Sequence, residues 1–130
     1  MRLLRAVVVT ALLVLGLGGE GPRAARDQSP PPAAARLELL VLEVRNCSVC
    51  ELVRDHIQPA WERSPRAREV PMRYVDITTL DETKIGLKTP VDTLPTIVLM
   101  RDGQEVDRLI GYMGPELALR ALGQMIEAAE

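Results

Sequence analysis

The order of apolar and polar positions predicts a buried strand that leads directly into a helix. Residues 37–44 (LELLVLEV) are apolar at nearly every position, a density that suits a central strand covered on both faces. From Ser48 to about Arg63 the apolar residues take up helical spacing, and the face they form holds Val49, Leu52, Val53, Ile57, Ala60 and Trp61. Because Pro59 lies inside this stretch, we expect a kink or an early end of the helix there.

The middle of the chain predicts a second strand and a short helical piece. In residues 70–77 (VPMRYVDI), every second residue from Val70 through Met72 and Tyr74 to Asp76 falls on one face, which is typical of a strand. Residues 81–87 are weakly helical, and Gly86 and Pro90 limit their length. We therefore expect little regular structure between the second strand and the next one.

A β-hairpin is predicted next. Residues 96–100 (TIVLM) form the third strand, and the Asp-Gly pair at 102–103 is a hairpin turn signal. The returning strand, residues 105–111, should direct Val106, Arg108 and Ile110 to one face, with charged neighbours on the other.

The chain closes with a helix, and the order of elements sets the fold class. Pro115 opens this helix at its first turn, and the apolar face comprises Leu117, Leu119, Ala121, Leu122, Met125 and Ile126. A right-handed crossover makes the first two strands parallel, and the hairpin adds antiparallel strands. The sequence thus predicts an α/β fold in which helices flank a single mixed four-stranded sheet.

The N-terminal residues differ in composition from the rest of the chain. Arg2 and Arg5 precede an apolar run over residues 6–19, the pattern of a secretory signal. This run is shorter than the ~20 residues that cross a bilayer comfortably. We interpret residues 1–19 as a signal peptide or a short N-terminal anchor, residues 20–35 as a Pro/Ala-rich linker, and residues 36–130 as the folded domain.

The composition argues against nucleic acid as a partner. The chain has no Phe, one Trp and two Tyr, so stacking platforms for bases are scarce. Its 16 basic and 18 acidic residues give a formal charge of -2, which provides no basic field for phosphates.

Cys47 and Cys50 occupy the place where the first strand turns into the helix. The unpaired N–H groups and the dipole at a helix N-terminus stabilise an anion, and the thiolate is the reactive form of cysteine. Cys47, the first and more exposed of the two, is the candidate attacking sulfur. Cys50, one turn further on, would resolve the mixed disulfide.

Two other interpretations use the same cysteines. The pair could bind metal, as a metal-binding or metallochaperone module, with His56 as a third ligand, although the sequence offers no fourth ligand at a plausible spacing. It could also be an inert structural disulfide in a binding protein. His56 fits an ordinary helix residue better than a ligand.

Several of these features together resemble the thioredoxin superfamily. They are the strand before the C-x-x-C pair at 47–50, the Leu94-Pro95-Thr96 sequence before the third strand, the Asp-Gly hairpin and the closing helix. The likeness covers residues 37–128. It implies disulfide exchange on proteins without metal or organic cofactor, a cis Pro95 beside the cysteines, and a Leu94 backbone that pairs with the substrate polypeptide.

A finer likeness is to SoxS-type periplasmic proteins of sulfur-oxidation clusters. It rests on the segments NCSVC at 46–50, PMRYVDI at 71–77, TLPTIV at 93–98 and RLIGY at 108–112. This resemblance implies a periplasmic reductase that keeps a client thiol usable, the client being a protein with a disulfide or modified cysteine, such as a sulfur carrier. An exported reductase needs electrons from the cytoplasm, so a membrane thiol-transfer reductase is the expected donor.

The chain departs from typical thioredoxins around the cysteines. Those proteins have Trp before the first cysteine and Gly-Pro between the pair, where this chain has Asn46 and Ser48-Val49. They also carry a buried acid six residues before the first cysteine, and that position is Val41 here. Glu43 is the nearest carboxylate and is therefore the candidate proton acceptor.

Overall fold

The computed structural model describes residues 36–130. The predicted leader at residues 1–19 and the predicted linker at residues 20–35 lie outside the described residues. Within residues 36–130, no helix has both the length and the apolar character needed to cross a membrane.

Four strands form one mixed sheet, as predicted. They are β1 (Leu37–Glu43), β2 (Met72–Asp76), β3 (Thr96–Arg101) and β4 (Gln104–Ile110), in the order β2-β1-β3-β4. β1 pairs with β2 in parallel, and β1–β3 and β3–β4 pair antiparallel. β1 is an inner strand whose middle four side chains are buried, which accounts for its continuous apolar sequence.

The helix after β1 contains a wider turn before its proline. It runs as α1 (Ser48–Leu52), the π-helical turn η1 (Val53–Ile57) and α2 (Gln58–Glu62). In a regular α-helix the ring of Pro59 would clash with the carbonyl four residues back, and the π-helical turn lies at that point. The expectation of an early end at Pro59 is therefore wrong, because the helix continues to Glu62.

This helix buries a different stripe from the predicted one. Its buried side chains are spaced three or four residues apart and are Cys50, Val53, Ile57 and Trp61. Val49 and Leu52, predicted for the core, are 42% and 36% exposed. The side of the helix that packs on the sheet carries Cys50, whereas Val49 and Leu52 lie on the exposed side.

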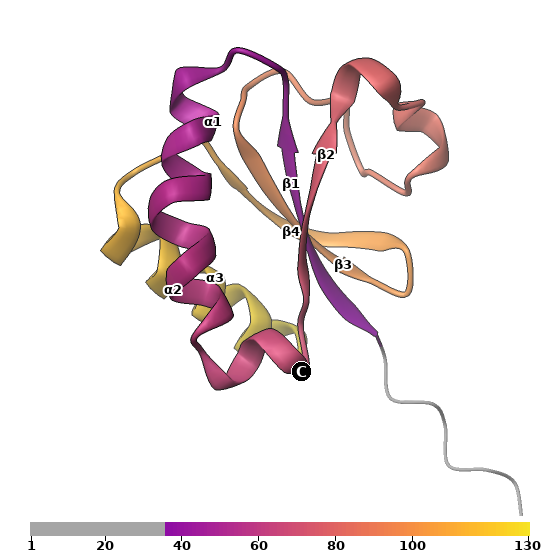
Figure 1. Ribbon diagram of the computed structural model, residues 1–130. Helices are drawn as coiled ribbons and strands as arrows, with labels where there is room; N and C mark the ends of the chain where they lie inside the picture. Colours follow the sequence, from indigo (N-terminus) through magenta and orange to yellow (C-terminus); the bar gives the residue numbers. More distant parts are fainter. Residues whose placement is uncertain (1–35) are drawn as a thin grey trace, which may run out of the picture. The chain divides into compact units, whose positions relative to one another are not determined.

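The last helix, α3 (Pro115–Ala129), packs on the same face of the sheet as α1 and α2. Figure 1 shows these helices together on one side of the strands. The buried residues of α3 are Ala118, Leu122, Met125 and Ile126. Leu117, expected on this face, is 54% exposed. Ala118, next along the chain, is the buried residue of this first turn.

The opposite face of the sheet is covered by the segment between β2 and β3. This segment contains the short 3₁₀ helices η3 (Ile77–Thr79) and η4 (Glu82–Lys84), which lie on the other side of the sheet in Figure 1. Its apolar side chains pack on a second cluster of buried residues, Leu40, Leu42, Val98 and Met100. The sheet is thus covered on both faces, by the longer helices on one and by this segment on the other.

A β-bulge in β4 changes which side chains face the core. The register of β3 and β4 shifts between Leu99 and Met100, which gives β4 one extra residue, Val106. Beyond the bulge Leu109 is buried and Ile110 is 51% exposed. The predicted face of Val106, Arg108 and Ile110 is therefore wrong, since a regular alternation of two cannot pass through a bulge.

Candidate active site

Cys47 and Cys50 are joined by a disulfide at the first turn of the helix. Their Cα atoms lie 5.2 Å apart. Cys47 is the N-cap of α1, and its Sγ accepts a hydrogen bond from the Cys50 N–H at 3.2 Å. Asn46, just before, has φ 60, a left-handed conformation that Asn tolerates better than most residues. The tight turn from the buried strand thus delivers Cys47 to the helix N-terminus, as the sequence predicts.

The two sulfur-bearing residues differ in exposure. Cys47 is partly exposed, whereas Cys50 is only 2% exposed. A client sulfur can therefore reach Cys47 directly, while Cys50 lies behind it and is aligned to attack the Cys47 sulfur. The unpaired N–H groups of the first turn stabilise a negative charge on Cys47.

The sheet register brings the Leu94-Pro95 loop to the same end as the cysteines. Leu42, near the end of β1, pairs with Thr96 at the start of β3, so the residues after β1 and those before β3 share one edge. The Leu94–Pro95 peptide bond is cis, which confirms that expectation. Pro95 is buried and Leu94 is partly exposed.

A second loop lies against this cis-proline. The Gly111 N–H donates to the Pro95 carbonyl at 2.8 Å. Next along the chain, the hydroxyl of Tyr112 lies 2.8 Å from Nδ1 of His56, so the loop is tied to the helix that carries the cysteines. Tyr112 belongs to the segment RLIGY that carries the finer resemblance, but no local pattern in the sequence predicts its contact with His56. Within residues 36–130, no three His, Cys, Asp or Glu side chains gather in a way that could hold a metal ion.

Glu43 faces the helix and is paired with a cation. It lies on the same face of β1 as Val41, and its side chain is 14% exposed. Arg54 donates to both carboxylate oxygens, from Nε at 3.1 Å and from Nη2. Arg54 follows Cys50 by four residues, so both side chains project from one side of the helix. The Glu43 carboxylate is therefore held on the side of the helix from which Cys50 projects.

Comparison with known proteins places this arrangement in a family. No family model matches the chain. The crystal structure of the periplasmic thioredoxin SoxS from Paracoccus pantotrophus, in its reduced form, superposes with a TM-score of 0.67 at 30% identity. The superposition covers 72% of this chain and 99% of that one. The chain belongs to the thioredoxin superfamily.

Other thioredoxins agree with this assignment. The chain is 29% identical over 80 residues to thioredoxins of Mycobacterium bovis and Mycobacterium tuberculosis, a match that spans 62% of this chain and 66% of theirs, just under two thirds. The thioredoxin of Fasciola hepatica superposes with a TM-score of 0.52 at 28% identity, over 67% of this chain and 77% of its own. These thioredoxins and the Cys47–Cys50 disulfide together support thiol–disulfide oxidoreductase activity.

In this member of the thioredoxin superfamily, an aromatic ring stacks on the Glu43–Arg54 pair. The guanidinium carbon of Arg54 lies 3.9 Å from the centre of the Tyr74 ring, a stacked cation–π contact. The Tyr74 hydroxyl is buried without a hydrogen-bond partner. Burial raises the pKa of Tyr74 to about 12, against a smaller opposing effect of Arg54. The Arg54 guanidinium is thus held both by the stacked Tyr74 ring and by the Glu43 carboxylate.

The raised pKa of Tyr74 predicts a loss of stability at alkaline pH. The unfolded chain releases the tyrosine proton near its ordinary pKa of about 10, before the folded protein does. The contribution of Tyr74 is thus fully present below pH 10 and is lost as the pH rises through about 12. Denaturant unfolding between pH 9 and 12 should show a smaller alkaline decrease in Tyr74→Phe than in the wild type.

The matched control is Tyr112→Phe, which should keep the alkaline decrease of the wild type. Since the Tyr74 hydroxyl has no partner, Tyr74→Phe should be no less stable than the wild type at pH 7. An identical alkaline decrease in Tyr74→Phe and in the wild type would refute this account of Tyr74.

Proposed function

We propose that this protein is a periplasmic thiol–disulfide reductase that acts on a client protein. The observation that carries the proposal is the arrangement of the two cysteines, with a reachable Cys47 at the helix N-terminus and a buried Cys50 behind it. The apolar Val49 between them is exposed, as a surface that meets polypeptide clients requires. Export is supported by the basic and apolar pattern of residues 1–19 and by the likeness to a periplasmic thioredoxin.

The proposed reaction moves two electrons from the enzyme to the client. The Cys47 thiolate attacks one sulfur of the client disulfide, and the other client sulfur leaves as a thiolate that takes up a proton. Cys50 then loses its proton and attacks Cys47 Sγ, which releases the second client thiol and closes the Cys47–Cys50 disulfide. A membrane thiol-transfer reductase, the proposed electron donor, returns the pair to the dithiol form.

The client class follows from the finer resemblance. SoxS-type proteins keep a carrier thiol usable, so the proposed client is a protein with a disulfide or a modified cysteine, such as a sulfur carrier. The proposed binding surface includes the Leu94 backbone beside the cis Pro95. An extended client segment would pair with this backbone while its sulfur faces Cys47.

Trapping of clients tests the roles of the two cysteines. Cys50→Ser keeps the attacking thiolate but removes the resolving one, so mixed disulfides between Cys47 and clients should accumulate in cells that express the full chain. The matched control, Cys47→Ser, should trap none. Equal trapping by both variants, or trapping by Cys47→Ser alone, would contradict the assigned roles.

The direction of the reaction is tested by the redox state of the same pair. A reductase should have a potential near that of thioredoxin, about -270 mV, whereas an oxidant lies near -120 mV. In cells the pair should be mostly reduced, and it should become oxidised when the membrane donor is deleted. If the Cys47–Cys50 pair stayed oxidised in cells that contain the membrane donor, the reductive assignment would be overturned.

Glu43 is the proposed proton acceptor for Cys50. Because Cys50 is buried, its thiol loses a proton with difficulty unless a nearby base takes it. Glu43→Gln should slow the release of client by Cys50 by roughly 10- to 100-fold and leave the first attack by Cys47 unchanged. Rapid-mixing kinetics with reduced protein and oxidised insulin chains separate the two steps.

The control for this variant lies on the same strand. Glu38, at the other end of β1, pairs with Arg73 at 3.0 Å, so Glu38→Gln removes a comparable ion pair far from the cysteines. It should leave both steps at wild-type rates. Equal rates of the second step in Glu43→Gln and Glu38→Gln would remove Glu43 from the mechanism.

A further inference from the structure

A buried ion pair on β4 lies outside the chemistry described so far. Glu105 and Arg108 form two hydrogen bonds, Arg108 Nε to Oε1 and Nη2 to Oε2, both at 2.6 Å. Their side chains are only 3% and 15% exposed. A buried ion pair is costly to desolvate, and neither residue contacts the cysteines in the hydrogen bonds of this structure. The hydrogen bonds that this ion pair makes to other residues indicate its structural role.

The β-bulge is what places both charges on one face. Residues three apart on a regular strand point to opposite faces. Because Val106 is the extra residue of the bulge, Glu105 pairs with Met100 and Arg108 pairs with Val98, two residues of the cluster on the same face. That face is the one covered by the segment between β2 and β3. The bulge therefore aims the ion pair at this segment.

The ion pair holds the backbone of residues 88–90 directly. Glu105 accepts from the Lys88 N–H at 2.7 Å. Arg108 donates to the carbonyl of Thr89 at 2.9 Å and to that of Pro90 at 3.4 Å. Hydrogen bonds from Arg108 are the largest cause of the lowered pKa of Glu105, and the Lys88 N–H adds to it, so the carboxylate stays charged in this site.

The rest of this segment is held in the same manner up to the cis-proline. The Val91 N–H donates to a carboxylate oxygen of Glu82 at 3.1 Å, and the hydroxyl of Thr96 donates to the Thr93 carbonyl at 2.7 Å. Among the described residues, every hydrogen bond of the backbone of residues 88–93 is thus made with a side chain. Residues 88–93 belong to no helix or strand, so side chains set the path of the chain into Leu94.

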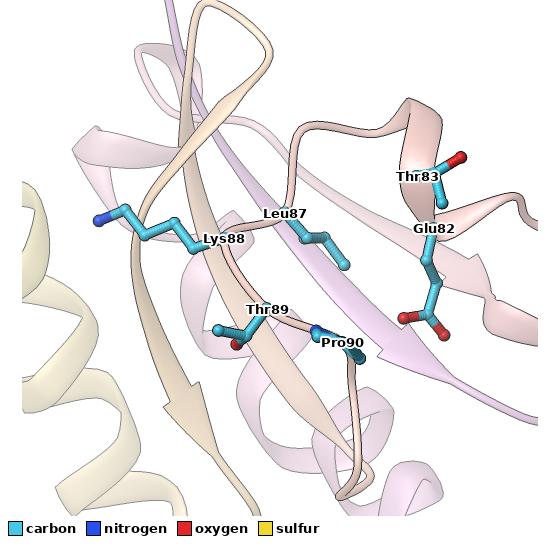
Figure 2. A pocket seen from close by; sticks show the side chains of 6 residues that line it. All are labelled: Glu82, Thr83, Leu87, Lys88, Thr89 and Pro90. Atoms are coloured by element: carbon cyan, nitrogen blue, oxygen red, sulfur yellow. The ribbon is translucent and has the colours of Figure 1, made fainter.

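Lys88, Thr89 and Pro90 of this segment also line a pocket, shown in Figure 2. The pocket has a volume of about 170 Å³. The side chain of Lys88 extends away from Leu87, and its Nζ donates to the Val106 carbonyl at the bulge, at 2.8 Å. The apolar side chains of the segment, Leu87, Val91 and Leu94, pack on the buried cluster of the sheet. The backbone between Leu87 and Val91 is held by the polar contacts of Glu105 and Arg108.

We propose that Glu105 and Arg108 are positioning residues that hold the Lys88–Pro90 backbone, and so align the Leu94 backbone for the client polypeptide. This inference rests on the proposed function, in which a client pairs with Leu94. The ion pair does not act on the sulfur atoms. Its loss should weaken the productive binding of a polypeptide and leave the exchange chemistry of Cys47 intact.

The test compares a polypeptide disulfide with a small one. Arg108→Lys keeps the charge but cannot donate to Glu105 and to both carbonyls at once, and Glu105→Gln keeps the shape but loses the charge. For both variants, the KM for insulin reduction should rise about tenfold. The rate with hydroxyethyl disulfide and the potential of the cysteine pair should equal those of the wild type.

The control variant is Arg73→Lys, which alters the Arg73–Glu38 ion pair between β2 and β1, at the opposite edge of the sheet from β4. It should reduce insulin like the wild type. Folded Arg108→Lys with wild-type kinetics on both substrates would overturn the proposal, even if its melting temperature is lower. Equal losses with insulin and with hydroxyethyl disulfide would also overturn it, because the defect would then lie in the cysteine pair.

Amide hydrogen exchange provides a readout that does not depend on turnover. In both variants, exchange at Lys88 and Val91, whose N–H groups are hydrogen-bonded, should become faster relative to Leu122 in the core. Unchanged relative exchange at these amides would contradict the proposal. If wild-type protein itself fails to reduce insulin, the proposed function falls first, and the exchange data still decide whether the ion pair holds the segment.

Discussion

The site depends on the junction at which the buried strand β1 turns into the first turn of the helix. β1 is fixed by neighbours on both sides and by side chains on both faces. The helix is fixed by a stripe of four buried residues that begins with Cys50 itself. Because both elements are anchored in the core, the turn between them has little freedom, and Cys47 is held at the unpaired N–H groups that stabilise a thiolate. The reactivity of one sulfur is thus a consequence of how the core is packed.

Around this junction each part of the site is bonded to a different element. The cis Pro95 is tied to Gly111, Tyr112 is tied to His56 on the helix, and Glu43 is tied to Arg54. The end of β1, the residues just before β3 and those just after β4 supply these contacts, and the register of one sheet brings them together. This arrangement explains how a domain of about 95 residues (36–130) can hold in place the loop before the cis-proline, which has no regular structure. The loop is positioned by side chains of rigid elements, among them the buried Glu105–Arg108 pair.

The strands and the cysteine pair could be predicted because each has a local signal: apolar density for β1, and a C-x-x-C pair at the start of a helix. The cis state of Pro95 could be predicted only through the resemblance to the thioredoxin superfamily. The predictions that were wrong are those that assumed a regular helical or strand periodicity without interruption. The π-helical turn carries the helix through Pro59, and the bulge at Val106 exchanges the buried and exposed positions that follow it. Contacts such as Arg54 with Glu43, or Arg108 with Thr89, join residues 11 and 19 positions apart. No local pattern encodes such contacts, because the pairing is created by the fold.

The most direct test of this account is the pH dependence of Cys47 alkylation in the reduced protein, measured by mass spectrometry with Cys50 as an internal comparison. The account predicts that iodoacetamide modifies Cys47 first, and that the rate gives a pKa for Cys47 well below the free-cysteine value of about 8.5. A Cys47 that resists alkylation, or that titrates at or above 8.5, would contradict the account, because the helix terminus would then not be stabilising the thiolate.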